Sequence, residues 1–222
     1  MTYIALFISV IFGYAVALLF KKKELTQLPI LLAFSGAFLL ATTLFELLPE
    51  VFEGPSEHIG LFIMIGILLQ IVLDFFSKGA EHGHVHLHSE TKTFPLLLFL
   101  SLSLHAIIEG VPLTENTAML YGVIVHKIPI TIILALFFSK AGYRQSTTLI
   151  FLILFALMTP LGSYLMETLP IMTTYSNEIN AVAIGIFLHV STTILFESSK
   201  NHSFNLSKMV AVCIAVVIAY FI

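Results

Sequence analysis

The sequence predicts an all-α membrane protein, with eight transmembrane helices in one bundle and both termini extracytoplasmic. Three observations lead to this prediction. Of the 222 residues, 58 % are hydrophobic and only 10 % are charged, whereas a soluble domain carries roughly a quarter charged residues. Apolar segments of about 20 residues, the length that a helix needs to cross a bilayer, recur along the whole chain. The basic residues cluster in alternate connections between these segments.

The apolar segments follow one another with little ambiguity. The first, 2–20, has no basic residue before it and is followed by Lys21, Lys22 and Lys23, which is the opposite charge order to a secretory signal. It is therefore expected to remain as a span. The other spans are expected at 28–48, 59–77, 94–113, 119–139, 147–166, 179–197 and 206–222. Because the connections are short, residues 1–222 are expected to form a single transmembrane domain.

Orientation follows from the basic residues. Nine of the ten lie in or beside the first, third, fifth and seventh connections: Lys21, Lys22, Lys23, Lys78, Lys92, Lys140, Arg144, Lys200 and Lys208. The other connections hold acids: Glu50, Glu53, Glu57, Glu115, Glu167 and Glu178. Because loops rich in lysine and arginine stay in the cytoplasm, both termini are expected outside, in a multi-pass protein of the cell membrane.

Three polar side chains in the fourth and fifth spans indicate a metal site. His105 and Glu109 are four residues apart and so share one helix face. Counting inward from the short outer turn, His126 lies at a similar depth in the next, antiparallel span. Imidazole and carboxylate are ligands that suit zinc. Pro112 and Pro129 each remove a backbone donor close to these residues. The alternative is that His105 and Glu109 simply hydrogen-bond between helices.

The positions of other polar residues along the spans suggest further roles for them. Lys127, inside the fifth span, is expected to be the charge partner of Glu109. The candidates for the path of the ion are Glu46 on the outer side and Asp74, His189 and Glu197 toward the cytoplasm. A packing role is an equal alternative for His189.

The connection at about 78–93 has a metal-binding composition. His82, His84, His86 and His88 alternate with other residues there. Because this connection is expected in the cytoplasm, it would receive or sense metal after passage. A plain solvated loop is the alternative.

At these residues the chain resembles the ZIP (Zrt/Irt-like) metal transporters. The family's fourth span carries His-Ser/Asn-x-Pro/Phe-Glu-Gly, and residues 105–110 read His-Ala-Ile-Ile-Glu-Gly. Its fifth span often reads His-Lys/Glu-x-Pro-Glu-Gly, and residues 126–131 read His-Lys-Ile-Pro-Ile-Thr. Residues 35–50 and 185–193 are similar to the family's second and seventh spans. The resemblance implies metal uptake toward the cytoplasm, with His105, Glu109 and His126 as the transport-site ligands.

Two departures from the family pattern bear on the number of ions. Many members have a glutamate where this chain has Ile130, and an asparagine where it has Ala106. Members with two adjacent metals use such groups for the second ion. One metal site, rather than two, is therefore expected here.

The expected function is transport of a divalent metal ion, with no enzyme activity. Zn²⁺ is the first candidate substrate, and the donor set also suits Fe²⁺, Mn²⁺, Co²⁺ or Cd²⁺. Apart from the ion and the lipid bilayer, a homodimer is a further candidate assembly, and the net charge of −3 gives no indication of nucleic-acid binding. An intramembrane zinc-dependent hydrolase is the main alternative, although no His-Glu-x-x-His run occurs. A metal sensor or structural membrane protein is another. The single cysteine, Cys213, excludes an intrachain disulfide and a multi-cysteine zinc site.

Overall fold

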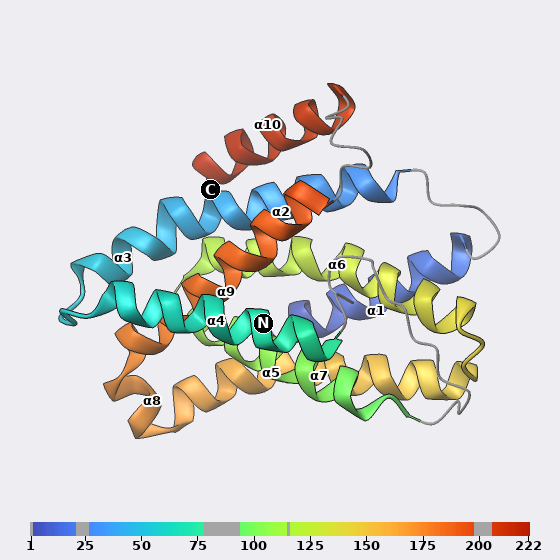
Figure 1. Cartoon of the computed structure of the whole chain (residues 1–222), viewed down its shortest axis with the longest axis horizontal. Helices are drawn as coiled ribbons and strands as arrows, with labels where there is room; N and C mark the ends of the chain where they lie inside the picture. The colour runs from blue at the N-terminus through green and yellow to red at the C-terminus, as the bar shows by residue number, and fades with distance from the viewer. Residues whose placement is uncertain (1, 21–26, 78–93, 115, 198–205) are drawn as a thin grey trace.

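The computed structural model describes residues 2–20, 27–77, 94–114, 116–197 and 206–222. Within these residues, every regular element is helical. Seven helical segments of this part of the chain are long and apolar enough to cross a membrane. Most of the long helices run side by side, roughly along the long axis of the molecule (Figure 1). The coarse prediction of a helical, multi-pass membrane protein is confirmed.

The helices follow the predicted spans closely. In the first half they are α1 (Thr2–Phe20), α2 (Leu28–Thr42), α3 (Leu48–Glu53), α4 (Ile59–Ser77) and α5 (Leu96–Glu109). In the second half they are α6 (Thr117–Lys140), α7 (Gln145–Thr168), α8 (Pro170–Thr174), α9 (Ser176–Glu197) and α10 (Leu206–Tyr220). The short helix α8 has no counterpart among the predicted spans. With 15 residues, α10 is shorter than the roughly 20 residues that usually cross a bilayer.

The second span is longer than the predicted 28–48. A π-helical turn, Thr43–Leu47, joins α2 to α3, so that 26 residues form one apolar helical stretch. Pro49 lies in the first turn of α3 and has no N–H to bond the carbonyl one turn earlier. The N–H of Leu48 instead bonds the carbonyl of Thr43, five residues back. The helix therefore continues past the proline with a locally wider turn.

The fourth span also differs from its prediction at its outer end. The α-helix ends at Glu109, and the chain continues as a 3₁₀ turn, Val111–Thr114. Pro112 lies within this turn and so outside the α-helix. The physical reason is that the residue before a proline disfavours α-helical backbone. The end of α5 therefore coincides with one of the candidate ligands.

Packing divides the helices into two groups. One contains α1, α5, α6 and α7, in which α1 packs on α6 and α7, and α5 packs on α7. The other contains α2, α4, α9 and α10, in which α9 packs on α2 and α4, and α10 packs on α2. The main contacts between the groups join α2 to α6 and α4 to α5. The candidate ligands lie on α5 and α6, in the first group.

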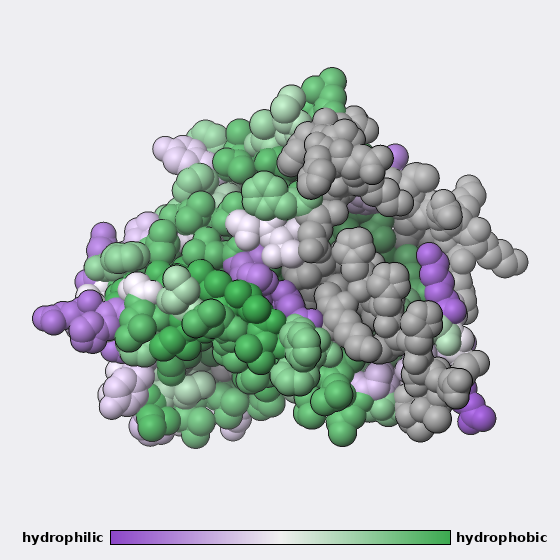
Figure 2. All heavy atoms as spheres, in the orientation of Figure 1, coloured by the Kyte–Doolittle hydropathy of each residue, from purple (hydrophilic) through white to green (hydrophobic). Residues whose placement is uncertain are grey.

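The surface of the described residues has the character of a lipid-facing one. Among the described residues, hydrophobic side chains cover most of the face drawn in Figure 2, and many hydrophilic ones gather at its two ends. On α4 the exposed residues include Leu61, Leu68 and Phe75. Polar residues are instead buried among the helices, among them Gln70, Thr131 and Ser163. This arrangement suits a protein whose solvent is the bilayer.

Candidate metal site

The structure brings together the three residues that the sequence indicates as ligands. One ligand atom each from His105, Glu109 and His126 lies within 4.8 Å of the other two. All three side chains are buried, at most 4 % exposed. The first two lie one helical turn apart on α5, and the third lies on α6. Their role as ligands is a prediction, and three ligand atoms this close together could hold a metal ion.

Contact between α5 and α7 fixes the position of Glu109. A Cβ atom added to Gly162 of α7 would lie 1.9 Å from the carbonyl oxygen of Ile107, so the two backbones touch. The Ser163 hydroxyl donates to the carbonyl of Gly110 at 2.6 Å. One turn earlier on α7, the hydroxyl of Thr159 donates a long hydrogen bond of 3.4 Å to Glu109 Oε2. Helix α7 therefore packs against the C-terminal end of α5 and holds it in place.

Lys127 forms the expected ion pair. Its Nζ atom donates to Glu109 Oε2 at 2.7 Å, and both side chains are buried. The same ammonium lies 4.8 Å from the centre of the Phe155 ring, a favourable cation–π arrangement. The second carboxylate oxygen, Oε1, is buried without a hydrogen-bond partner among the described residues. The pair is thus neutral overall, while one carboxylate oxygen stays available to a ligand.

Helix α6 positions both His126 and Lys127. Asn116 caps its first turn by accepting a hydrogen bond from the Met119 N–H at 3.0 Å. Pro129 lies inside α6, where it leaves the carbonyl of Val125 without its α-helical donor. The Thr131 hydroxyl donates to the carbonyl of Lys127 at 2.8 Å. The ligand-bearing turn therefore lies directly before a local break in the hydrogen-bond ladder.

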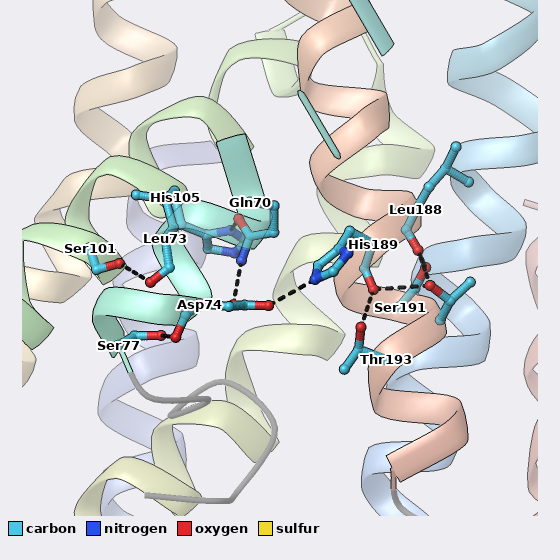
Figure 3. A network of polar contacts seen from close by, with 11 residues as sticks. Gln70, Leu73, Asp74, Ser77, Ser101, His105, Leu188, His189, Ser191 and Thr193 are labelled. Carbon is cyan, nitrogen blue, oxygen red and sulfur yellow. Dashed lines mark hydrogen bonds and ion pairs between the residues drawn. The ribbon is translucent and has the colours of Figure 1, made fainter. Parts of the chain in front are cut away.

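A chain of polar contacts leads from His105 to two of the predicted path residues (Figure 3). His105 Nδ1 lies 3.0 Å from Gln70 Oε1, and Gln70 Nε2 donates to Asp74 Oδ1 at 3.0 Å. The other oxygen, Asp74 Oδ2, lies 2.8 Å from His189 Nε2. Asp74 and His189 are 17 % and 22 % exposed. These two residues come from α4 and α9, so α4 and α9 join α5, α6 and α7 around the site.

The remaining predicted residues lie elsewhere. Glu46 is exposed within the π-helical turn and does not belong to the cluster of three. Glu197 is the last residue of α9, and its side chain lies outside the described part. The four histidines of the 78–93 connection, His82, His84, His86 and His88, lie outside the described residues.

Sequence reasoning missed several residues that contact the candidate ligands or the backbone next to them. Gln70 could have been found, because an amide in an apolar span, four residues before Asp74, shares a helix face with it. Thr159 and Ser163 of α7 gave no such signal, since hydroxyls commonly bond the backbone of their own helix. Their contacts cross to α5 and depend on tertiary packing.

Comparison with known proteins assigns the family. A family model described as ZIP zinc transporter matches residues 77–222, more than half of the chain and all of the three clustered residues. A relative, zinc transporter ZIP1 of Danio rerio, is 32 % identical over 90 residues, which cover 38 % of this chain and 30 % of that protein. The match thus spans about a third of the length of this relative. The chain belongs to the ZIP zinc transporter family.

Proposed function

We propose that this protein carries divalent metal ions, zinc first, across a membrane through a single site formed by His105, Glu109 and His126. The observation that carries the proposal is the convergence of three metal-ligating atoms within 4.8 Å in the buried interior. Buried ionisable groups in a membrane protein are costly, so a cluster of them indicates a function. The family description as zinc transporters favours transport over the hydrolase alternative.

The donor set suits zinc. Two neutral imidazoles and one carboxylate are typical protein ligands for Zn²⁺, at about 2.0–2.2 Å from the ion. In the tetrahedral geometry that zinc prefers, two such ligands lie about 3.4 Å apart, so a separation of 4.8 Å would need to close by about 1.4 Å. Rotation of a side chain is enough for such a shift. Fe²⁺, Mn²⁺, Co²⁺ and Cd²⁺ are further candidate substrates, because affinity for this donor set does not by itself select one ion.

Charge compensation would let the site exist without metal. A lone carboxylate in a low-dielectric interior is costly, and the Lys127 ammonium at 2.7 Å cancels its charge. An arriving dication repels the ammonium and competes with it for Glu109. We infer that Lys127 acts as a stand-in cation that metal displaces from the carboxylate. Because only one carboxylate is present in the cluster, one ion at a time is expected.

The proposed topology has eight spans in a single domain, with both termini outside. Support comes from α10, which packs along α2 and would form the eighth span together with the two residues that follow it. The distribution of basic residues then places the 78–93 connection in the cytoplasm. Its four histidines would receive the ion after passage toward the cytoplasm. Residence in the cell membrane and assembly as a homodimer are parts of the same proposal.

Two groups of path residues complete the proposal. Glu46, exposed on the outer half of the second span, would attract ions, because acidic groups raise the local cation concentration. Asp74 and His189, which pair at 2.8 Å, lie on the release side together with Glu197.

Zinc flux into proteoliposomes tests the proposed function. The wild-type protein is expected to load vesicles with radioactive zinc, and His105→Ala is expected to reduce uptake to the level of protein-free vesicles. His58→Ala serves as the matched control, because His58 is exposed and precedes α4. Wild-type vesicles that bind zinc without accumulating it would contradict transport and favour a sensor. Equal uptake by wild type and His105→Ala would contradict the proposed site.

A further inference from the structure

Three residues outside the metal cluster contact one another in a line that ends at His105. Gln70 and Asp74 lie one turn apart on α4, and His189 lies on α9. Figure 3 shows the Asp74 carboxylate between Gln70 and His189, with its two oxygens turned to different partners. Gln70 is fully buried. A buried primary amide is costly unless both its ends are hydrogen-bonded, and here both ends have a partner.

The chemistry of the partners determines which atom donates and which accepts in each of these hydrogen bonds. An ionised carboxylate only accepts hydrogen bonds, so Asp74 requires the NH₂ end of the Gln70 amide on its side. The carbonyl end then faces His105, and a carbonyl oxygen also only accepts. His105 Nδ1 must therefore carry the hydrogen, which leaves the lone pair on Nε2. The negative charge of Asp74 thus determines which ring nitrogen of His105 is available as a ligand.

We propose that Gln70, Asp74 and His189 are positioning residues that hold His105 as its Nδ1–H tautomer, with Nε2 directed at the metal. This inference deepens the proposed function and rests on it. Metal-ligating histidines commonly donate their second ring N–H to such a partner, which fixes ring orientation and raises ligand basicity. His189 completes the line by donating from Nε2 to Asp74 Oδ2, which holds the carboxylate in place.

The surrounding packing holds α4 in the required position. The Ser101 hydroxyl of α5 donates to the carbonyl of Leu73 at 2.5 Å, close to both Gln70 and Asp74 in sequence. Two turns earlier on α4, a Cβ added to Gly66 would lie 2.1 Å from the carbonyl oxygen of Val182 on α9. Helix α4 is thus fixed against α5 and α9, the two helices that its polar residues bridge. Hydrogen bonds across such tight contacts keep their geometry.

The first test reads the tautomer directly, without metal. Nitrogen NMR of full-length protein labelled with ¹⁵N-histidine distinguishes Nδ1–H from Nε2–H. The signals of His105 are identified as those that disappear in His105→Ala. We expect Nδ1–H in the wild type. Asp74→Asn is expected to give a mixture, because an asparagine can present either end to the Gln70 amide. Gln70→Leu is expected to give mainly Nε2–H, the form that free imidazole side chains prefer.

An exchange of the amide and carboxylate groups between the two positions provides the rescue. In the double variant Gln70→Glu/Asp74→Asn, the carboxylate moves to position 70 and still accepts from His105. The amide at position 74 can donate to it and accept from His189. Every donor keeps an acceptor, and side-chain sizes are unchanged. The double variant is expected to regain the Nδ1–H signal that Asp74→Asn loses, which a merely structural role of either residue does not predict.

The second test measures zinc affinity by competition with a chelating dye. Loss of a hydrogen-bond partner behind a ligand typically weakens metal binding by roughly 10- to 100-fold, and this range is expected for Gln70→Leu and Asp74→Asn. Thr148→Val is the matched control, because Thr148 is buried and its hydroxyl bonds the backbone carbonyl of Arg144, the residue just before its helix. Its affinity is expected to equal that of the wild type.

The outcomes separate this inference from the proposed function. Zinc uptake by the wild type, together with unchanged tautomer and affinity in Gln70→Leu, would overturn the positioning role and leave transport standing. An Nε2–H signal in the wild type would also overturn it. Absence of zinc uptake by a wild type whose His105 shows the Nδ1–H signal would instead contradict the proposed function alone.

Discussion

The single substitution Glu109→Gln is expected both to abolish zinc uptake and to lower the thermal stability of the protein. The amide has the size of the carboxylate but neither its charge nor its strength as a ligand. It also leaves the Lys127 ammonium, 2 % exposed, without its counterion. Removing one partner of a buried ion pair costs about 3–5 kcal/mol. Uptake measured in proteoliposomes and unfolding followed by circular dichroism in detergent give the two readouts.

A double variant separates the two consequences. Glu109→Gln/Lys127→Met removes both charges and keeps similar side-chain volumes, so it is expected to recover most of the lost stability. Uptake should stay at the background level, because the carboxylate ligand is still missing. If the double variant is as unstable as Glu109→Gln, an uncompensated ammonium is not the cause of the instability, and the proposed charge compensation is wrong.

Lys127→Met alone gives the complementary result. It leaves the Glu109 carboxylate buried without the ammonium, and it removes the cation that competes with zinc. Added zinc is therefore expected to raise its melting temperature more than that of the wild type, since a ligand that binds only the folded state stabilises it. Zinc should have no such effect on Glu109→Gln. Equal zinc responses of Lys127→Met and the wild type would contradict competition between the two cations.

The convergence of the three candidate ligands could be predicted because the bilayer limits the alternatives. Helices that cross one apolar layer have nearly fixed lengths, so depth follows from counting residues from the nearest turn. The i, i+4 spacing then puts His105 and Glu109 on one face, and the short connection to α6 makes His126 their neighbour. The ion pair followed from charge alone, because a buried ammonium needs a counterion and Glu109 was at the same depth.

The hydrogen bonds that link His105 to α4 and α9 could not be predicted in the same way. Gln70 precedes His105 by 35 positions, and Asp74 precedes His189 by 115, so these contacts depend on which helices are neighbours. Sequence periodicity says little about helix order within a bundle. Local backbone details were missed for a different reason. The π-helical turn before Pro49 and the 3₁₀ turn at Pro112 are two distinct ways to accommodate a proline, and the sequence alone does not choose between them.

Gly162→Ala is expected to disable transport although residue 162 bears no ligand. The added methyl group would lie 1.9 Å from the carbonyl oxygen of Ile107 and 2.8 Å from its carbonyl carbon. Those are backbone atoms of α5, so no side-chain rotation relieves the clash and α5 must move away from α7. Ile107 lies between His105 and Glu109, and both candidate ligands would move with it. Overpacking of this kind typically costs about 1–3 kcal/mol.

Uptake and melting temperature of Gly162→Ala, measured against Gly60→Ala, test this expectation. Gly60 lies in the first turn of α4, and a Cβ added there meets nothing within 4 Å. Both substitutions add one methyl group to a helix, so any general effect on helix formation is shared between them. We expect normal uptake for Gly60→Ala and a strong loss for Gly162→Ala. Normal uptake by both variants would mean that α5 and α7 do not meet backbone to backbone, and that the support behind Glu109 is not rigid.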